Sequence, residues 1–545
     1  MGRRPFRRED YVRKFCEPTE GIPGTNEPDR FLRAAQTACD LRRGELDELN
    51  LAALLWQLGQ GQSGYFEREG SFIQARKRVG GCVRKEHDLE IAAGISARLD
   101  RLPATRYIWK LVILLSLGGC FEMYDLFFTA YIGPGLVRSG LFSSASTSFF
   151  SFSGLASFVA ATFAGLFVGT MLFGFAADWF GRRMVFTCSL LWYTAATVAM
   201  AFQHTAIGIV ALRMIAGIGI GVELVTIDTY ITELVPKHLR GRAFAVNQVI
   251  QFTVVPLVAL LAWLLVPRNP LGFDGWRWVV LIGAFSAIFV WFIRRAVPES
   301  PRWLISHGHW AEAEKVTAAM EARVEEELGT ALPVVNPHVV EEVHSHFFDI
   351  FKPPYLSRTT MLMVFNFFQT VGYYGFASWV PTLLIAAGVT TTSSLQYSFI
   401  IAIAAPVGPL LAMNFADKFE RKWQIVGAAL CIGVFGLLFA RQSSSNWLIV
   451  FGVLLTCSNN WMSMAFHAYQ PELFPTAVRA QGVGFVYSWS RLSAIFTSYL
   501  IGFFLRDFGV SGVFAFIAIS MVVVMLAIGM FGPRTRGLAL EDISQ

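Results

Sequence analysis

The chain carries the stretch GFAADWFGRR at residues 174–183, and a related stretch, ADKFERK, follows at residues 416–422. Five positions recur at one separation of 239 residues: Asp178 as Asp417, Arg182 as Arg421, Glu233 as Glu472, Pro236 as Pro475 and Arg240 as Arg479. Hydropathy alone does not fix polar and helix-ending positions at a single offset. The pattern therefore predicts that one half of the chain is a duplicate of the other.

The composition places both copies in a lipid bilayer. Of the 545 residues, 54% are hydrophobic and only 15% are charged, whereas a soluble protein is usually about 25% charged. The apolar residues come in blocks near the length of a bilayer-crossing helix, roughly 20 residues. These figures exclude a soluble enzyme, a nucleic-acid-binding module and a disordered scaffold. Because lipid admits only helices or closed barrels, and the blocks are too long for barrel strands, we expect an all-α integral membrane protein.

The apolar blocks predict two bundles of six helices. We expect spans over residues 108–132, 152–177, 184–203, 207–232, 244–266, 277–296, 361–387, 395–416, 423–440, 447–471, 481–504 and 511–531. The expected domains are an N-terminal extension with little structure (1–107), a first bundle (108–296), a central loop with amphipathic helices (297–360), a second bundle (361–531) and a tail (532–545). We expect the protein to be a monomer.

The basic residues predict the orientation. The loops after even-numbered spans carry Arg182, Arg183, Lys237, Arg240, Arg242, Lys418, Arg421, Lys422 and Arg479. The opposite loops carry Arg138, Arg268, Arg277, Arg441 and Arg506. Since cytoplasmic loops hold the excess of Lys and Arg, both termini and the central loop should be cytoplasmic, in the plasma or inner membrane. Two repeats in the same orientation imply an axis along the membrane normal and a site between the halves, which is typical of a transporter.

Several signals are missing that other functions would require. Seven cysteines are scattered without a CxxC spacing, which argues against a disulfide framework and a zinc site. The pairs His307/His309 and His344/His346 fall in the central loop and are expected to be solvated. No Gly-x-x-x-x-Gly-Lys-Ser/Thr phosphate loop occurs, which argues against an ATP-driven pump. We therefore expect no enzymatic activity, no cofactor, no metal and no nucleic-acid partner.

The first quoted stretch resembles the loop signature of the major facilitator superfamily, Gly-x-x-x-Asp-x-x-Gly-Arg-Arg. Gly174 would let two helices approach closely, and Asp178 could meet the positive N-terminus of a neighbouring helix. The arginines would pair with acids at the bundle end and close it reversibly; the alternative is that they only set topology. In the second copy Glu420 replaces the glycine. The gating candidates are Gly174, Asp178, Gly181, Arg182, Arg183, Glu233, Arg240, Asp417, Arg421, Glu472 and Arg479.

Other stretches resemble the sugar-porter branch of that superfamily. They are Arg213-x-x-x-Gly217-x-Gly219-x-Gly221, Glu233-x-x-Pro236-x-x-x-Arg240, Gly275–Trp278, Pro298–Leu304 and the ending from Pro533 to Glu541. At the family's sugar-contact positions this chain has Val255, His467 and the stretch FQTVGYY at 368–374. A sugar needs many polar contacts, and each one it fails to find costs about 1–3 kcal/mol. An aromatic lining favours a flat, partly apolar ligand.

Two features indicate that the ligand is an anion. The stretch FEMYD at 121–125 resembles the acidic motif of aromatic-acid and metabolite:proton symporters, including niacin carriers, as do residues 367–381 and 487–496. An arginine at mid-membrane, here Arg491, costs at least about 2.5–3.5 kcal/mol and should have a partner. A substrate carboxylate fits its guanidinium fork; helix carbonyls or Glu472 are the alternative. The substrate-binding candidates are Arg491, Gln369, Tyr373, Tyr374, Trp379, His467 and Tyr124.

The coupling candidates are the ionisable residues within the spans. Asp125 in the first span and Arg213 in the fourth lie at similar depth, and the resemblance places an Asp–Arg pair there. Glu122 and Glu223 are further candidates. Asp228 could serve the proton or, in preference, the inner charge network. His467 could relay protons or simply be packed.

We therefore expect a secondary transporter that takes up a small organic anion with a proton by alternating access, the anion being an aromatic or heterocyclic carboxylate. A sugar or polyol:proton symporter is the alternative from the same class. A non-transporting membrane receptor with a regulatory extension is the alternative from another class.

Overall fold

A computed structural model describes residues 91–143, 154–173, 176–285, 296–334, 347–353, 355–415, 419–474 and 479–535. The helices discussed below all belong to one compact unit that begins at Ile95. Most of the expected N-terminal extension therefore lies outside the described residues, as do Gly174 and Asp417 and the side chain of Arg479.

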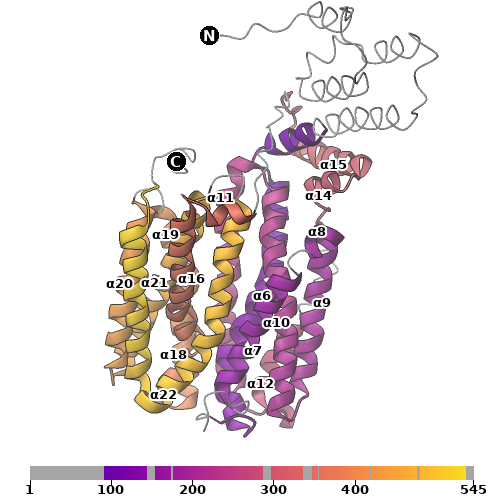
Figure 1. The fold of residues 1–545 in the computed structure, drawn as a ribbon. Helices are drawn as coiled ribbons and strands as arrows, with labels where there is room; N and C mark the ends of the chain where they lie inside the picture. The colour runs from indigo at the N-terminus through magenta and orange to yellow at the C-terminus, as the bar shows by residue number, and fades with distance from the viewer. Residues whose placement is uncertain are drawn as a thin grey trace, which may run out of the picture. The chain divides into compact units, whose positions relative to one another are not determined.

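The first half of the unit consists of helices that run side by side (Figure 1). They are α6 (Arg106–Arg138), α7 (Leu155–Phe173), α8 (Ala176–Phe180), α9 (Arg182–Ala201), α10 (Ala206–Leu234), α11 (Arg240–Leu265) and α12 (Gly275–Ala284). Thr105 caps the first turn of α6 and Thr205 that of α10, each by accepting a backbone N–H. These caps satisfy donors that a helix start leaves without an internal partner.

The central loop contains two helices, α14 (Pro301–Ser306) and α15 (Trp310–Leu328). Pro301 occupies the first turn of α14, and the hydroxyl of Ser300 accepts from the backbone of Trp303. The helix α15 ends at Gly329, whose φ of 68° lies in the left-handed region that glycine adopts without strain. A short turn, η4 (Phe347–Phe351), precedes the second half.

The second half repeats the helical pattern with more interruptions. It consists of α16 (Tyr355–Ala377), α17 (Val380–Ala386), α18 (Thr391–Ala402), α19 (Ala404–Phe415), α20 (Arg421–Ala440), α21 (Ser445–Glu472) and α22 (Arg479–Phe531). The expected seventh span is divided between α16 and α17, and the eighth between α18 and α19. The last two spans form a single long element that kinks at Gly509, with φ 66° and ψ −164°.

The all-helical membrane fold predicted from the sequence is confirmed. Each expected span overlaps a helix in the described part of the chain. Eight helices there are long and apolar enough to cross a membrane. The boundaries differ from the expected ones chiefly at α6, which extends past the expected end to Arg138, and at α16, which begins before the expected start, at Tyr355.

Glycines bring α7 and α10 into close contact. A Cβ added at Gly169 would lie 2.1 Å from the carbonyl oxygen of Ile218, and one added at Gly165 would lie 2.2 Å from that of Met214. On the opposing helix, a Cβ at Gly221 would lie 2.4 Å from the carbonyl oxygen of Leu166. Small residues let helix backbones approach in lipid, where helices gain little from burying apolar surface against each other. The glycine spacing in the fourth span is therefore a packing feature.

In the described part of the chain, the two halves meet chiefly along four helix pairs, which are α7 with α22, α11 with α18, α11 with α19, and α6 with α17. Aromatic contacts mark the seam. The rings of Phe163 and Tyr374 lie 4.5 Å apart, and those of Trp263 and Phe399 stack at 5.9 Å. The seam is therefore formed by several helices from each half, with aromatic rings from both sides in contact.

Candidate functional site

A buried ion pair joins α6 to α10. The carboxylate of Asp125 lies 2.7 Å from the guanidinium of Arg213, and the two side chains are 5% and 0% exposed. Thr197 donates to the other carboxylate oxygen of Asp125 at 3.0 Å. The structure thus brings together the two residues that the sequence placed at similar depth.

The remaining nitrogens of Arg213 are also engaged. Its Nε donates to the hydroxyl of Thr162 at 2.9 Å, and its Nη2 donates to the hydroxyl of Thr129 and the backbone carbonyl of Asp125. The ring of Phe128 lies 4.6 Å from the guanidinium carbon, a distance at which a cation is attracted to an aromatic face. A charge pair removed from water is stable only when its other donors and acceptors are satisfied as well. The threonines of α6, α7 and α9 provide this.

A second buried cation lies near the seam between the halves. Arg491 of α22 is 2% exposed. Its two terminal nitrogens donate to the hydroxyls of Tyr374, at 3.1 Å, and Tyr487, at 3.2 Å. Tyr374 in turn packs against Phe163 of the first half. Arg491 is therefore held by neutral tyrosine hydroxyls at the place where the repeats meet.

The alternative that Glu472 neutralises Arg491 is wrong. Glu472 forms an ion pair with Arg421 instead. The acids whose charges act on Arg491 come from the first half, namely Glu122 of α6 and Asp228 of α10. The charge of Arg491 also acts on Asp228, so a place for Asp228 near the Arg491 side chain is added to its predicted place in the inner charge network, which stays a prediction.

Two further candidates, His467 and Tyr373, contact the tyrosines that bind Arg491, and a third, Gln369, lies on the helix of Tyr374. His467 has its ring 5.6 Å from that of Tyr487, and Tyr373 packs edge-on against Tyr374 at 5.0 Å. Gln369, on the same helix as both tyrosines of the motif, is buried and donates to the hydroxyl of Thr370. His467 and Asp228 are both exposed although they surround a buried arginine. Solvent therefore reaches the edge of this cluster, which we call the Arg491 cluster.

Two predicted substrate residues lie elsewhere. The hydroxyl of Tyr124 donates to the carbonyl of Val279 in α12 at 2.7 Å, and its ring packs against Phe128. Trp379 is 3% exposed at the start of α17, beside Gly502 of α22. Tyr124 points into the bundle because α12 closes over that face of α6. Both residues thus contribute to helix packing and are not part of the Arg491 cluster.

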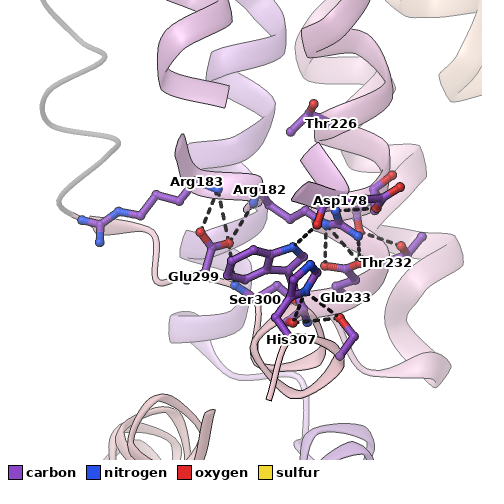
Figure 2. Close-up of polar contacts among 12 residues, drawn as sticks. Asp178, Arg182, Arg183, Thr226, Thr232, Glu233, Glu299, Ser300 and His307 are labelled. Atoms are coloured by element: carbon purple, nitrogen blue, oxygen red, sulfur yellow. Dashed lines mark hydrogen bonds and ion pairs between the residues drawn. The ribbon is translucent and has the colours of Figure 1, made fainter. Parts of the chain in front are cut away.

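An inner charge cluster joins the ends of α8, α9 and α10 (Figure 2). Arg182 forms ion pairs with Asp178, at 2.7 Å, and Glu233, at 2.8 Å. The carboxylate of Glu299 accepts from the backbone N–H groups of Arg182 and Arg183 at 3.0 and 3.2 Å. Figure 2 shows the side chain of Arg183 extending away from Glu299.

The acid at the N-terminus of α9 is Glu299, whereas Asp178 forms an ion pair with Arg182, and its contact with the N-terminus of a neighbouring helix stays a prediction. A carboxylate stabilises this end of a helix because it accepts from N–H groups that have no internal partner. Burial raises the pKa of Glu299, and backbone N–H groups of Ser300, Arg183 and Arg182 partly offset this. Gly181 enables the contact: its φ is 91°, and a Cβ there would lie 2.7 Å from Glu299.

In the second copy, the structure places Arg421 against Glu472, as Arg182 lies against Glu233 in the first. Arg240 donates to the carbonyl of Val235 and lies 3.9 Å from Asp100. Within the described ranges, no group of three or more His, Cys, Asp or Glu side chains is arranged to hold a metal ion.

The chain is similar to known transport proteins. Residues 111–545 match the model of a family described as sugar (and other) transporter. The putative metabolite transport protein YyaJ of Bacillus subtilis is 31% identical, over 83% of this chain and 98% of the relative. The niacin transporter NiaP of Acinetobacter baylyi is 27% identical, over 82% of this chain and 99% of the relative.

The fold is also found among solved structures. A partially occluded, inward-open conformation of the xylose transporter XylE from E. coli superimposes with a TM-score of 0.65. It covers 80% of this chain and all of that one at 22% identity. At this identity the likeness establishes the fold alone.

Proposed function

This chain belongs to the sugar (and other) transporter family of the major facilitator superfamily, and on that premise we propose that it couples uptake of a small organic carboxylate to an inward flow of protons. Membership makes it a multi-pass membrane transporter of a small metabolite and not an enzyme. The proposal adds the chemistry of the substrate, an aromatic or heterocyclic acid, and the coupling ion. It also takes both termini to be cytoplasmic, as the basic residues predict.

The observation that carries the proposal is Arg491 with its two tyrosine hydroxyls. Among the described residues, the hydrogen-bond partners of this guanidinium are neutral hydroxyls, and a carboxylate could accept two parallel N–H bonds from it. The rings of Tyr373, Tyr374 and Tyr487 offer faces and edges to a flat ligand. An acid with an aromatic ring would therefore use both features of the Arg491 cluster.

The buried pair of Asp125 and Arg213 is the proposed coupling element. As a carboxylate, Asp125 holds α10 through Arg213. Adding a proton removes its negative charge, so the guanidinium keeps only hydroxyl and carbonyl partners and the two helices can repack. Proton binding and substrate binding must then strengthen each other by the same factor. Glu122 and Glu223 are the other carboxyls proposed to take part.

The inner charge cluster is proposed to stabilise one end of the first half and to rearrange during the transport cycle. Arg182, Arg183, Glu233 and Gly181 would contribute in the first half, and Arg421 with Glu472 in the second. Asp178 would act through its ion pair with Arg182.

The relatives support an acid over a sugar. Two of them are named as niacin or niacin/nicotinamide transporters, whereas the xylose transporters share the fold at 20–22% identity. Gln369 is the glutamine retained from the sugar-contact motif. Its side-chain amide already donates to the hydroxyl of Thr370. A sugar or polyol remains the alternative substrate class. A receptor without transport activity would require the extension for function, so deleting residues 1–90 without loss of uptake would weigh against it.

A thermal-shift screen tests the substrate class. Detergent-purified protein would be heated with nicotinate, benzoate, hexoses and polyols at an acidic and a neutral pH. We expect the two acids to raise the unfolding temperature, and more so at the acidic pH, because proton binding should tighten substrate binding. Stabilisation by hexoses alone would favour the alternative.

A further inference from the structure

Two carboxyls in the first half are buried without the partners that buried charges require. Glu122 of α6 is 1% exposed and Glu223 of α10 is 0% exposed. Among the described residues, one carboxyl oxygen of Glu122 and both of Glu223 make no hydrogen bond. A buried carboxylate without a partner carries a large free-energy cost, and a protonated carboxyl carries much less.

The neighbours of these two carboxyls are mostly acids. The charges acting most strongly on Glu122 come from Asp228 of α10 and from Arg491 of α22. Those acting on Glu223 come from Glu122 and Asp125, and the hydroxyl of Tyr193 from α9 lies beside it. Each negative charge opposes ionisation of the next, and burial opposes it further, so at least one proton should reside among these carboxyls.

Arg213 and Arg491 do not neutralise all of the neighbouring carboxyls. Arg213 directs its nitrogens to Asp125, Thr129 and Thr162. Arg491 directs two of its nitrogens to tyrosines. Four carboxyls (Glu122, Asp125, Glu223 and Asp228) face two guanidiniums (Arg213 and Arg491), which leaves a formal excess of two negative charges when all are ionised. An incoming substrate carboxylate would increase that excess.

We propose that Glu122 and Glu223 together form a second proton site, separate from Asp125, and that two protons accompany each substrate carboxylate. This inference rests on the proposed function. One proton binds at Asp125 and frees Arg213; the other is shared between Glu122 and Glu223 and offsets the charge that the substrate brings to the Arg491 cluster. Two protons with one monovalent anion move one net positive charge inward, so transport is driven by an inside-negative membrane potential.

The test is potential-driven uptake of labelled nicotinate by the full-length protein in proteoliposomes without a pH gradient. With an inside-negative membrane potential, the wild type should accumulate several-fold more nicotinate than it does in vesicles without a membrane potential. A carrier that moves one proton per anion is electroneutral and would show no such gain. A pH gradient applied alone provides the comparison, because it drives uptake at either ratio.

The double variant E122Q/E223Q should lose potential-driven accumulation and keep accumulation driven by a pH gradient, because Asp125 remains. Accumulation driven by the pH gradient shows that the double variant is folded, and the variant E223D, which retains a carboxyl, should retain part of the potential-driven accumulation. Asp507→Asn, a matched change at an exposed outer ion pair, should behave like the wild type.

The outcomes separate this inference from the function on which it rests. If a pH gradient drives wild-type uptake and a potential does not, one proton is coupled and the second site is wrong, while the proposed function stands. Potential-driven accumulation by the double variant would also overturn the second site. If neither gradient drives uptake, proton symport itself fails.

Discussion

Asp125 of α6 and Arg213 of α10 lie 2.7 Å apart and are almost completely buried, although 88 residues separate them in the chain. Apart from Asp125, the hydrogen-bond partners that the structure describes for Arg213 are threonine hydroxyls and a backbone carbonyl, which are neutral groups. The charge of Arg213 is therefore balanced by one titratable carboxyl. Removing that charge by protonation is the smallest chemical change that can alter how α6 and α10 are held together.

The first prediction concerns Asp125→Asn. The asparagine keeps the shape and can still accept from Arg213, but it cannot take up a proton. We expect exchange of labelled nicotinate for unlabelled nicotinate to continue, and accumulation driven by a pH gradient to fall well below that of the wild type, because the proton that releases Arg213 can no longer bind. Both are measured in the same proteoliposomes. Full accumulation by this variant would show that Asp125 does not carry the coupled proton.

The second prediction concerns Arg491→Gln. Hydrogen bonds to a charged group are worth about 1.5–3 kcal/mol each. Losing such contacts to a substrate carboxylate should raise the Kd for nicotinate by about ten- to a hundredfold. Arg491→Lys keeps the charge without the planar fork and should have a smaller effect. Isothermal titration or the thermal shift at graded ligand concentration measures Kd.

The matched control for Arg491 is Arg506→Gln, an arginine in an exposed ion pair with Asp507. The Arg506→Gln variant should bind nicotinate with the Kd of the wild type. Unaltered nicotinate binding by the Arg491→Gln protein would assign Arg491 a structural role and remove the main argument for an anionic substrate.

The third prediction concerns the contact between α7 and α10. Gly169→Ala would place a Cβ 2.1 Å from the carbonyl oxygen of Ile218, so the two helices must separate. Overpacking of this kind typically costs about 1–3 kcal/mol, and the unfolding temperature in detergent should fall. Gly427→Ala in α20, where a Cβ would meet no atom within 4 Å, is the control and should not destabilise the protein. Equal stability of both variants would contradict the packing role.

The fourth prediction is a pH dependence of stability at α15. Burial alone would raise the pKa of Glu321, but hydrogen bonds from Arg98 and Arg101 outweigh it and hold the pKa below its ordinary value. A carboxyl with a lowered folded-state pKa stabilises the protein above its ordinary pKa, and this stabilisation is lost as the pH falls through the folded-state value.

We therefore expect Glu321→Gln to lower the unfolding temperature at neutral pH, and the difference from the wild type to shrink below about pH 4. Glu312→Gln, on the exposed face of the same helix, is the control. A difference between Glu321→Gln and wild type that stays constant with pH would show that the ion pairs contribute no stability there.

Much of the fold could be predicted from the sequence, because helices that cross a bilayer are long apolar segments. The repeat adds that the two halves of the chain have the same arrangement of helices. The division of the seventh span at Trp379 and the kink at Gly509 could not be predicted from hydropathy, since the apolar character continues through both. The pairing of Asp125 with Arg213 could be predicted because both residues lie at a similar depth in the membrane. Two buried charges of opposite sign attract each other strongly there.

The rest of the site depends on which helix faces which. Tyr487 lies one helical turn before Arg491 in the stretch YSWSRLSAIF, so the spacing offered a signal for their contact. Tyr193 carried no such signal, because only the packing of α9 against α10 brings it to Glu223. The role of Glu299 depends on the positive φ of Gly181, and nothing in the motif itself specifies that contact.

Uptake of labelled nicotinate against its gradient, with an acidic exterior imposed on proteoliposomes, tests the central claim most directly. The account predicts accumulation that a protonophore abolishes, together with a rise of internal acidity that requires nicotinate. Uptake that merely equilibrates, at a rate unaffected by the pH gradient or the protonophore, would contradict it.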